Sequence, residues 1–565
     1  MFKLRTAAAT VVAMSALTAC GGNSVSGDTS SLAAKQVLLI SVDGLHQVDL
    51  ANWIKNNPAS TLATLAKTGV TYSDARTTTP SDSFPGLLSM VTGGTPKTTG
   101  VYYDDSYDRT LYAPSSACSG AQGIEALYDE SIDYDDTQLF SGGINPANLP
   151  MQKDAQGNCS PVYPHSFVKV NTIFEVATTA GKLTAWSDKH PAYDLVNGPS
   201  GSGVADLYTP EINSLIANGG TVNGVDLSAT QALCDGSNSL PVKKVSDYTT
   251  CIPAIEAYDD IKIQAVINEI DGLRSDGSAG SGVPALFGTN MQEVSVGQKL
   301  PVGGYTDAAG TPSANLADTL AHTDASLGRI VAELKNRNLL DSTLIIITAK
   351  HGQSPIDPST LAMESGGSGN TSVQDPSGYI AAVDPNVDSP SSYTNPNSGD
   401  PLTTGGHLMA DDMGLVWLQD QSSTNIANVV ASLQDNASAM FADTLPPGTV
   451  FSTNITSGSA LAALYGDPTS DDPVAAARAP NVFIQPNAGV IYSGSSKKIA
   501  EHGGGTLDDT NVALLVSMPS LAAKTETASV STTQIAPTIL KALGLDPSKL
   551  QAVQKEGTKA LPDLF

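Results

Sequence analysis

The chain has 565 residues, of which 40 % are hydrophobic and 15 % are charged, so it is long enough for a large core and for more than one sub-domain. Its formal net charge of −27 repels nucleic-acid backbones, which excludes a general nucleic-acid binder. A substrate that carries phosphate must therefore find positive charge locally, in a metal ion or in lysine side chains.

The N-terminal segment is typical of an exported lipoprotein. Lys3 and Arg5 precede an apolar run that is too short to span a bilayer, and the run leads into an LTAC sequence that resembles a bacterial lipobox ending at Cys20. We expect a lipoprotein signal peptide over 1–20, a membrane anchor through a lipid on Cys20, and a flexible tether over 21–35. The protein would then lie in the bacterial cell envelope, on the periplasmic side of the outer membrane or at the cell surface.

Four further cysteines form an even set, which in an exported chain predicts two disulfides. The near pairings, Cys118 with Cys159 and Cys234 with Cys251, would each close a local loop. None of the four has the CxxC or CxxH spacing of a structural zinc site.

Buried strands and amphipathic helices alternate along the rest of the chain. Continuous apolar runs predict strands at 36–42, 184–187, 342–348 and 513–517. Helical periodicity predicts helices at 52–67, 171–180, 261–273, 316–336 and 533–543. This alternation argues for an α/β sandwich with a mostly parallel central sheet and helices on both faces.

Two stretches interrupt the alternation within a main unit over 36–565. The segment 104–165 is rich in Asp, Ser and Gly, and we expect it to form a disulfide-stapled excursion. The segment 414–492 has a β-α-β-like pattern, which we interpret as a small inserted α+β sub-domain.

Acidic and imidazole side chains follow the ends of the predicted strands. Asp43 comes after the strand 36–42 and His351 comes after the strand 342–348, where ligands bind in open α/β sheets. His502 lies beside glycines near the C-terminus. Carboxylate and imidazole side chains are the residue types that a metal-activated site requires.

Ser83, in SDSFPG, is the candidate nucleophile. A serine hydroxyl needs a base or a metal to become reactive, and no GxSxG elbow surrounds this one. A metal held by Asp43 and His351 would activate it, and the amides that begin the next helix would face an anion. Ser81, Asp82 and Ser83 also suit an ordinary helix N-cap.

In their order, the motifs resemble the alkaline phosphatase superfamily and, within it, the type I phosphodiesterase/nucleotide pyrophosphatase family. SVDGL is similar to the family's first metal-binding strand, SDSFPG to T-x-T-F-P-N with Ser83 at the nucleophile, AKHG to S-D-H-G, and EHGG to the segment of the last metal-binding histidine. The resemblance covers about residues 36–104, 316–352 and 500–545.

The resemblance implies an alkaline-phosphatase-like fold and the hydrolysis of phosphodiester or phosphomonoester bonds through a covalent Ser83 intermediate. The substrate would be a small-molecule phosphate ester. One or two divalent ions, zinc by preference, would be held by the set that the motifs supply: Asp43, Ser83, His351 and His502.

The sequence departs from the family at the metal ligands. The aspartate of S-D-H-G is Lys350, which while charged cannot ligate a metal but can stabilise charge on the transferring group. The family's D-x-x-x-H pair is missing between about residues 285 and 300, where Gln298 would stand near the histidine position and Gln292 or Glu293 near the acid. Replacement ligands could come from Glu293, His407, Asp411, Asp412, Asp508 or Asp509.

The resemblance also points to substrate contacts. Asp104 aligns with an asparagine that helps to bind phosphate. Lys189 and His190 belong to a loop that would line the substrate pocket, where Lys189 could contact phosphate; a solvated turn is the alternative.

Two other functions stay open. Sulfate-ester hydrolysis on the same fold would need a C-x-P-x-R or S-x-P-x-R signature, and SFPGL lacks the arginine. A degenerate, ligand-binding lipoprotein would explain Lys350 and the missing pair, although the retained Asp43, Ser83, His351 and His502 argue against it.

Overall fold

The computed structural model describes residues 32–240, 245–364, 371–441 and 454–565. The predicted signal peptide, Cys20 and most of the tether lie outside these ranges. Within them, no helix combines the length and the apolar character that crossing a membrane requires.

An eight-stranded sheet forms the centre of the molecule. One strand, β24, runs antiparallel to both of its neighbours, and the other seven are mutually parallel. The prediction of a mostly parallel sheet is therefore confirmed. In spatial order the strands are β25 (Lys524–Glu526), β2 (Gly69–Tyr72), β24 (Leu514–Ser517), β13 (Thr343–Thr348), β1 (Gln36–Val42), β12 (Leu286–Met291), β8 (Ala185–Ser187) and β9 (Asp206–Tyr208).

The central strands are apolar throughout because both faces of the sheet are covered. Along β1, Val37 and Leu39 pack into one hydrophobic core, whereas Leu38 and Ile40 pack into a second core on the opposite face. Successive side chains of a strand point to opposite faces, so one uninterrupted apolar run serves two cores.

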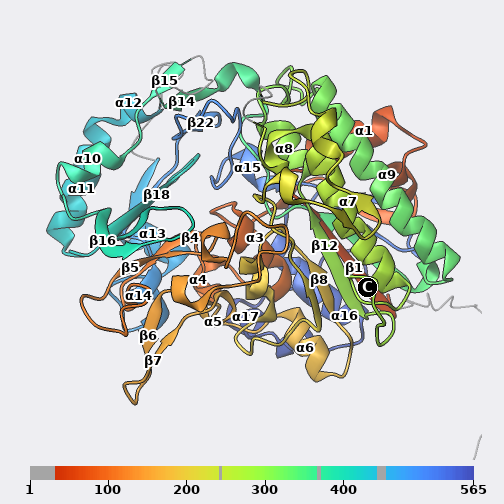
Figure 1. Ribbon diagram of the computed structural model, residues 1–565, viewed down its shortest axis with the longest axis horizontal. Helices are drawn as coiled ribbons and strands as arrows, with labels where there is room; N and C mark the ends of the chain where they lie inside the picture. The colour runs from red at the N-terminus through yellow and green to blue at the C-terminus, as the bar shows by residue number, and fades with distance from the viewer. Residues whose placement is uncertain (1–31, 241–244, 365–370, 442–453) are drawn as a thin grey trace, which may run out of the picture.

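Helices cover each face, as predicted (Figure 1). The core that holds Leu38 includes side chains from α1 (Gln47–Asn56), α2 (Thr61–Ala66), α7 (Ile252–Ile270), α8 (Glu293–Lys299) and α9 (Ala314–Asn336). The core that holds Val37 includes side chains from α3 (Ser83–Thr92), α6 (Ile173–Thr179) and α16 (Ile535–Ala542).

The prediction of one helix over 52–67 is wrong. The segment contains the end of α1 and the whole of α2, separated by a break in which Pro58 cannot continue a helix. Ser60 then caps the second helix, since its hydroxyl accepts a hydrogen bond from the Ala63 amide at 3.1 Å.

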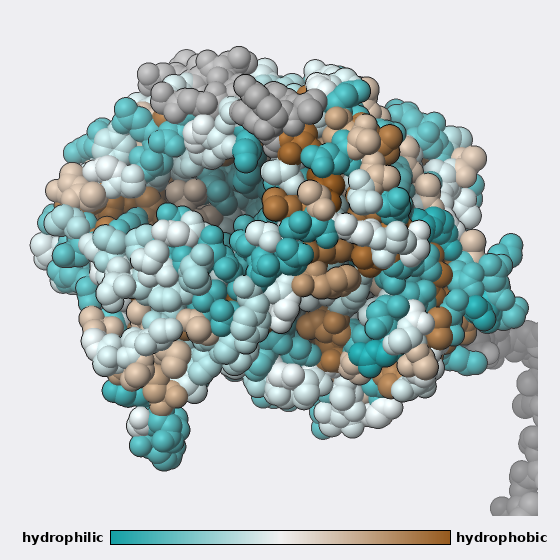
Figure 2. Space-filling view, viewed as in Figure 1, coloured by the Kyte–Doolittle hydropathy of each residue, from teal (hydrophilic) through white to brown (hydrophobic). Residues whose placement is uncertain are grey.

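A smaller antiparallel sheet has its own core. Its strands, in spatial order, are β18 (Gly406–Ala410), β19 (Gly414–Leu418), β21 (Val482–Ile484) and β20 (Ile455–Ser457). Side chains of α10 (Ser377–Ala381), α11 (Ser423–Asp435) and α12 (Ala437–Phe441) complete that core. Figure 2 shows a largely hydrophilic face that is hollowed between β18 and β22 (Val490–Ile491).

The segment after α3 contributes two strands to a further sheet, and residues 389–404 contribute the other two. The order is β16 (Ser389–Thr394), β17 (Pro401–Thr404), β5 (Ile124–Leu127) and β4 (Asp105–Asp108). Both predicted disulfides are present, Cys118–Cys159 and Cys234–Cys251, so each pairing closes a local loop.

Candidate active site

The two central strands deliver their polar side chains to one point. β1 and β13 are parallel neighbours in which Ser41 pairs with Thr348, so the residues that follow the strands emerge together. Asp43 leaves one strand, and Lys350 and His351 leave the other, all fully buried. This is the carboxyl edge of the sheet, where the sequence places the site.

Ser83 meets this edge from the start of α3. Asp82 is the N-cap, with its carboxylate accepting from the Phe84 amide at 3.2 Å, and Ser83 is the first helical residue. Asp82 is therefore the helix N-cap. This leaves the Ser83 hydroxyl available at the centre, so the cap and the candidate nucleophile are different residues. Ser83 Oγ lies 3.3 Å from His351 Nε2 and accepts a hydrogen bond from Lys189 Nζ at 3.2 Å.

The His351 ring is oriented by the backbone. Its Nδ1 lies 2.9 Å from the Gly352 carbonyl oxygen, which can only accept a hydrogen bond. A proton on Nδ1 leaves the lone pair on Nε2, and this nitrogen faces Ser83.

Asp43 is surrounded by donors and cations. Its two oxygens accept hydrogen bonds from Asn290 Nδ2 at 2.7 Å and from Gln292 Nε2 at 2.6 Å. Burial by itself raises the pKa of Asp43, but Lys350, His351 and Lys189 outweigh burial and hold it well below its usual range. The carboxylate therefore stays ionised.

Lys350 is held in one place by three groups. Its Nζ lies 3.4 Å from Asp43 Oδ2 and donates to Asp188 Oδ1 at 3.1 Å and to the Tyr193 hydroxyl at 3.0 Å. The same ammonium sits 4.2 Å from the centre of the Tyr193 ring. Asp188 was not singled out from the sequence, although it directly follows β8 and so emerges at the same sheet edge.

The backbone of α3 approaches Lys350 closely, and this requires glycine at position 86. A Cβ built on Gly86 would lie 2.1 Å from the Lys350 carbonyl oxygen. The family pattern has asparagine at position 86 and aspartate at position 350. This chain has glycine and lysine at these two positions, whose backbones lie against each other.

His502 lies beside His351, with 3.9 Å between the ring centres. Its Nδ1 is 3.4 Å from Asp82 Oδ1, and neither buried atom makes a hydrogen bond to a described residue. Burial above all, and then nearby lysines such as Lys299, holds the pKa of His502 well below its usual range, so its ring is neutral.

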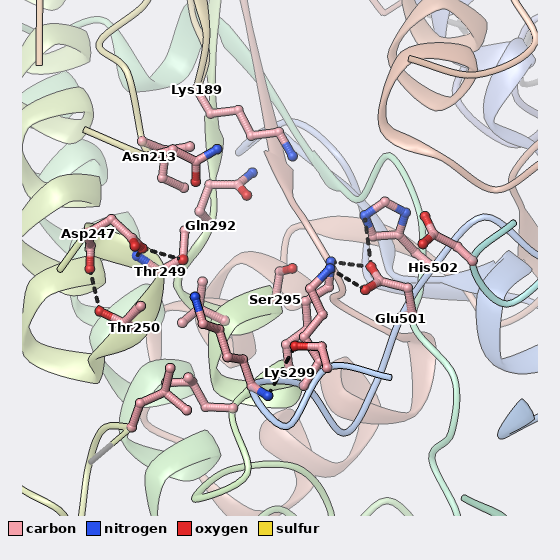
Figure 3. A pocket seen from close by; sticks show the side chains of 18 of the residues that line it. Lys189, Asn213, Asp247, Thr249, Thr250, Gln292, Ser295, Lys299, Glu501 and His502 are labelled. Atoms are coloured by element: carbon pink, nitrogen blue, oxygen red, sulfur yellow. Dashed lines mark hydrogen bonds and ion pairs between the residues drawn. The ribbon is translucent and has the colours of Figure 1, made fainter. Parts of the chain in front are cut away.

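A cavity of about 330 Å³ opens beside these groups. Figure 3 shows Lys189 and Gln292 on one side of it, and Glu501 and His502 on the other. Glu501 pairs with Lys299 at 2.7 Å and with Lys498 at 2.5 Å, which brings further positive charge to the wall.

The predicted substrate contacts all border this cavity: Asp104, Lys189 and His190. His190 Nδ1 lies 2.8 Å from Glu211, and burial lowers its pKa to about 4, so this ring is neutral too. Burial and then Asp82 raise the pKa of Asp104 well above its usual value.

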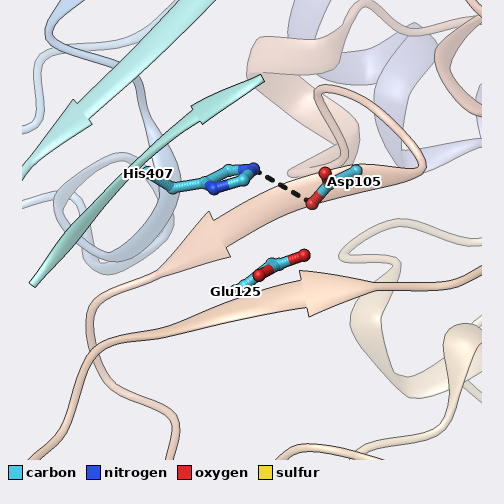
Figure 4. Close-up of side chains that lie close together, drawn as sticks. All are labelled: Asp105, Glu125 and His407. Carbon is cyan, nitrogen blue, oxygen red and sulfur yellow. Dashed lines mark ion pairs between the residues drawn. The ribbon is translucent and has the colours of Figure 1, made fainter. Parts of the chain in front are cut away.

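Most of the suggested replacement ligands lie elsewhere. Glu293 contacts His322 and Thr323 on α9, Asp508 accepts from the Ile356 amide, and Gln298 bonds to Gly44 and Tyr305. Of Gln292, Glu293 and Gln298, only Gln292 reaches Asp43. Asp411 lines the cavity, where its carboxylate accepts a hydrogen bond from the Tyr103 hydroxyl at 2.9 Å. His407 belongs to a separate group with Asp105 and Glu125, whose ligand atoms lie within 4.8 Å of one another (Figure 4).

Comparison with known proteins gives one family. The model described as type I phosphodiesterase/nucleotide pyrophosphatase matches residues 37–504. No curated protein matches the chain. Two solved structures of murine ectonucleotide pyrophosphatase/phosphodiesterase 5, one of them an inactive form in complex with AMP, each share 12 % identity and a TM-score of 0.47 with it, over 91 % of this chain and 96 % of the other.

Proposed function

The chain belongs to the type I phosphodiesterase/nucleotide pyrophosphatase family of phosphoric ester hydrolases, and we propose that it cleaves a small phosphodiester or phosphomonoester through Ser83. The observation that carries this proposal is the contact of one hydroxyl with both a base and a cation. His351 Nε2 lies 3.3 Å and Lys189 Nζ 3.2 Å from Ser83 Oγ, and Lys189 also lines the cavity.

The first half of the reaction uses these atoms directly. His351 Nε2 accepts the proton of Ser83 Oγ as the Oγ–P bond forms and the bond from phosphorus to the leaving oxygen breaks. Lys189 balances the charge that gathers on the phosphoryl oxygens. The leaving oxygen takes this proton from His351, which returns the ring to its neutral form for the second half.

Water completes the reaction. It attacks the phosphoserine, loses a proton to His351, and releases Ser83 and the phosphate product. The cavity beside the centre supplies the space for the ester's leaving group, and Asp104 and His190 border that space.

Members of this family typically depend on divalent metal ions. The sequence predicts zinc on Asp43, Ser83, His351 and His502. His351 Nε2 lies 3.3 Å from Ser83 Oγ and 3.4 Å from Asp43 Oδ2, which are ligand-like spacings. However, Lys350 Nζ and Lys189 Nζ stand among the same atoms, and two ammonium groups do not fit beside a divalent ion. No step is therefore assigned to a metal.

We propose export and lipid anchoring on Cys20 as the setting of this activity. Two disulfides support an oxidising compartment. In a bacterial host, the wild-type protein should fractionate with membranes and incorporate labelled palmitate, and Cys20→Ser should do neither. Equal membrane association of both forms would contradict the anchor.

The activity is tested with a chromogenic phosphodiester, the matching monoester and the matching sulfate ester. We expect turnover of a phosphate ester that falls at least about 1,000-fold in Ser83→Ala. Turnover of the sulfate ester alone would identify a sulfatase. Tight binding of a phosphate ester without any turnover would favour the ligand-binding alternative.

A further inference from the structure

Lys350 occupies the place where the family pattern puts a metal-binding carboxylate. It is fully buried, and its ammonium is satisfied by Asp43, Asp188 and Tyr193. The lysine side chain therefore stands between two carboxylates, at the place where the family pattern puts a third.

Both oxygens of Asp43 are engaged by donors. Each accepts a hydrogen bond from a side-chain amide, at 2.6–2.7 Å. Oδ2 also lies 3.4 Å from Lys350 Nζ, 3.4 Å from His351 Nε2 and 3.7 Å from Lys189 Nζ. A divalent ion would have to displace these amide donors and sit against two ammonium groups.

The second half of a two-metal centre is changed as well. Gln292 and Glu293 stand near the acid of the family's D-x-x-x-H pair, and Gln298 stands near its histidine. Gln292 Nε2 donates to Asp43 instead of presenting an oxygen to a cation, Glu293 contacts His322, and Gln298 donates to the Gly44 carbonyl oxygen. The retained His502 thus lacks the partners that the family pattern supplies.

We propose that this centre works without a divalent ion, and that Lys189 and Lys350 supply the positive charge that metals supply in the family. Lys189 would contact the phosphoryl group beside Ser83, Lys350 would hold Asp43 and Asp188 in place, and His351, freed from ligation, would act as the base. This proposal rests on the proposed role of Ser83, but the measurement of bound metal does not depend on that role.

The test restores the family's ligand. Wild type, Lys350→Asp and His351→Ala would each be loaded with zinc, dialysed and analysed for bound metal, with exposed Lys335→Asp as the matched control. All four would carry His407→Gln, which removes the separate histidine–carboxylate group. We expect equal zinc in wild type, His351→Ala and Lys335→Asp, and an additional equivalent only in Lys350→Asp.

Turnover is measured beside the metal content. Wild-type hydrolysis should survive a chelator, whereas added zinc should not raise it. Zinc that is bound by wild type and lost in His351→Ala, or turnover that is abolished by the chelator and restored by zinc, would overturn the proposal. If no ester is hydrolysed, the proposed function fails, while the metal content still decides whether the centre holds an ion.

A separate group of side chains outside the centre, unlike the centre itself, is suited to hold a metal ion. Asp105 on β4 and Glu125 on β5 lie on the same face of a hairpin, because Asp105 pairs with Leu127 and Tyr107 with Glu125. His407 reaches them from β18 (Figure 4). Their ligand atoms come within 4.8 Å of one another.

His407 is poised as a ligand. Its Nδ1 is engaged by Asp388 at 3.0 Å and by the Thr403 hydroxyl at 2.9 Å. Its Nε2 points at Asp105 Oδ1, 3.1 Å away. His407 is only 4 % exposed, and both facing atoms are buried without a hydrogen bond to the described residues. A carboxylate that holds one nitrogen of a histidine while the other nitrogen faces further carboxylates is the arrangement of metal-ligating histidines.

We infer that Asp105, Glu125 and His407 bind a divalent cation of the kind that accepts nitrogen and oxygen ligands, for which zinc is the probe. The ion would tie β18 of the small sheet to the β4–β5 hairpin. Asp104, next to one ligand, borders the active-site cavity, so the ion would also fix that wall.

Binding is measured as the rise in Tm caused by zinc. We expect a rise in wild type and in the control His165→Gln, whose histidine is paired with Asp194 at another place, and no rise in His407→Gln or Glu125→Gln. Two different ligand variants guard against a folding defect in either one. An equal rise in all four proteins, or none in wild type, would show that His407 is only an ion-paired imidazolium.

Discussion

At the scale of single residues, the active centre is defined by where positive charge lies. A chain with a net charge of −27 brings Lys189 to Ser83 and Lys350 to the neighbouring Asp43. It also brings Lys299 and Lys498 to the cavity wall. The acids among them, Asp43 and Asp188, pair with these cations. A substrate anion therefore meets a local positive site inside a negative surface.

Lys189 gives a direct test of this charge. Because its Nζ is 3.2 Å from Ser83 Oγ, Lys189→Met should lower kcat by about 100-fold or more. The control is Lys497→Met, which removes an exposed lysine that lines the same cavity. Equal losses in the two variants would mean that only the overall potential matters, and would contradict a direct contact.

Asp133 provides a pH-dependent prediction away from the centre. Burial, and then Glu211, raises its pKa to about 9, above its value of about 4 in an unfolded chain. The folded state therefore holds this proton more tightly, so stability falls as pH rises between about 4 and 9. Asp133→Asn keeps the neutral form and should be more stable than wild type by on the order of 1 kcal/mol at pH 8, but not at pH 4.

The measurement is Tm across this pH range. The difference between Asp133→Asn and wild type should widen from acid to alkaline pH, while exposed Asp400→Asn should follow wild type. Parallel curves for all three proteins would show that Asp133 is not held protonated.

At the scale of elements, the sequence predicts the strands that carry the site residues. It does not predict which side chains contact Asp43 and Lys350. Apolar runs gave β1 and β13, and their last residues gave Asp43 and His351. The contacts of Gln292 with Asp43 and of Asp188 with Lys350 depend on which strands are neighbours, and periodicity does not contain that information. The break between α1 and α2 was missed because the apolar spacing continues across Pro58.

The contact between α3 and the end of β13 yields a prediction at this scale. Gly86→Ala would place a methyl group 2.1 Å from a backbone oxygen, so the helix or the strand end must shift. We expect a loss of about 1–3 kcal/mol of stability and a fall in kcat.

Gly378→Ala in α10 is the matched control, because open space surrounds that helical glycine. It should be neutral or stabilising by up to about 1 kcal/mol. Denaturant unfolding compares the two variants, and an unchanged Gly86→Ala would mean that the close approach is not needed.

At the scale of the whole molecule, one sheet with two cores supports the centre, and the smaller units border it. The closing of local loops by two disulfides fits segments that have little apolar core of their own. The sequence predicts both pairings because each joins nearest neighbours in the chain. It does not predict that strands from positions 105–127 and 389–404 share a sheet, since such pairing depends on contacts far apart in sequence.

Removing Cys234–Cys251 should weaken the fold. Opening this link, whose cysteines are 17 residues apart, should lower the free energy of unfolding by on the order of 3 kcal/mol. The double variant Cys234→Ser/Cys251→Ser is compared with wild type by urea unfolding. An unchanged midpoint would show that the link does not constrain the unfolded chain.

The most direct test of the whole account is to trap the covalent intermediate. The protein would be mixed with a chromogenic phosphodiester in the presence of a chelator, quenched in acid within the first turnovers, and its peptides examined by mass spectrometry. We predict a phosphoryl adduct on Ser83 that is absent from Ser83→Ala. Sustained turnover with no adduct at any quench time, or turnover that persists in Ser83→Ala, would contradict the account.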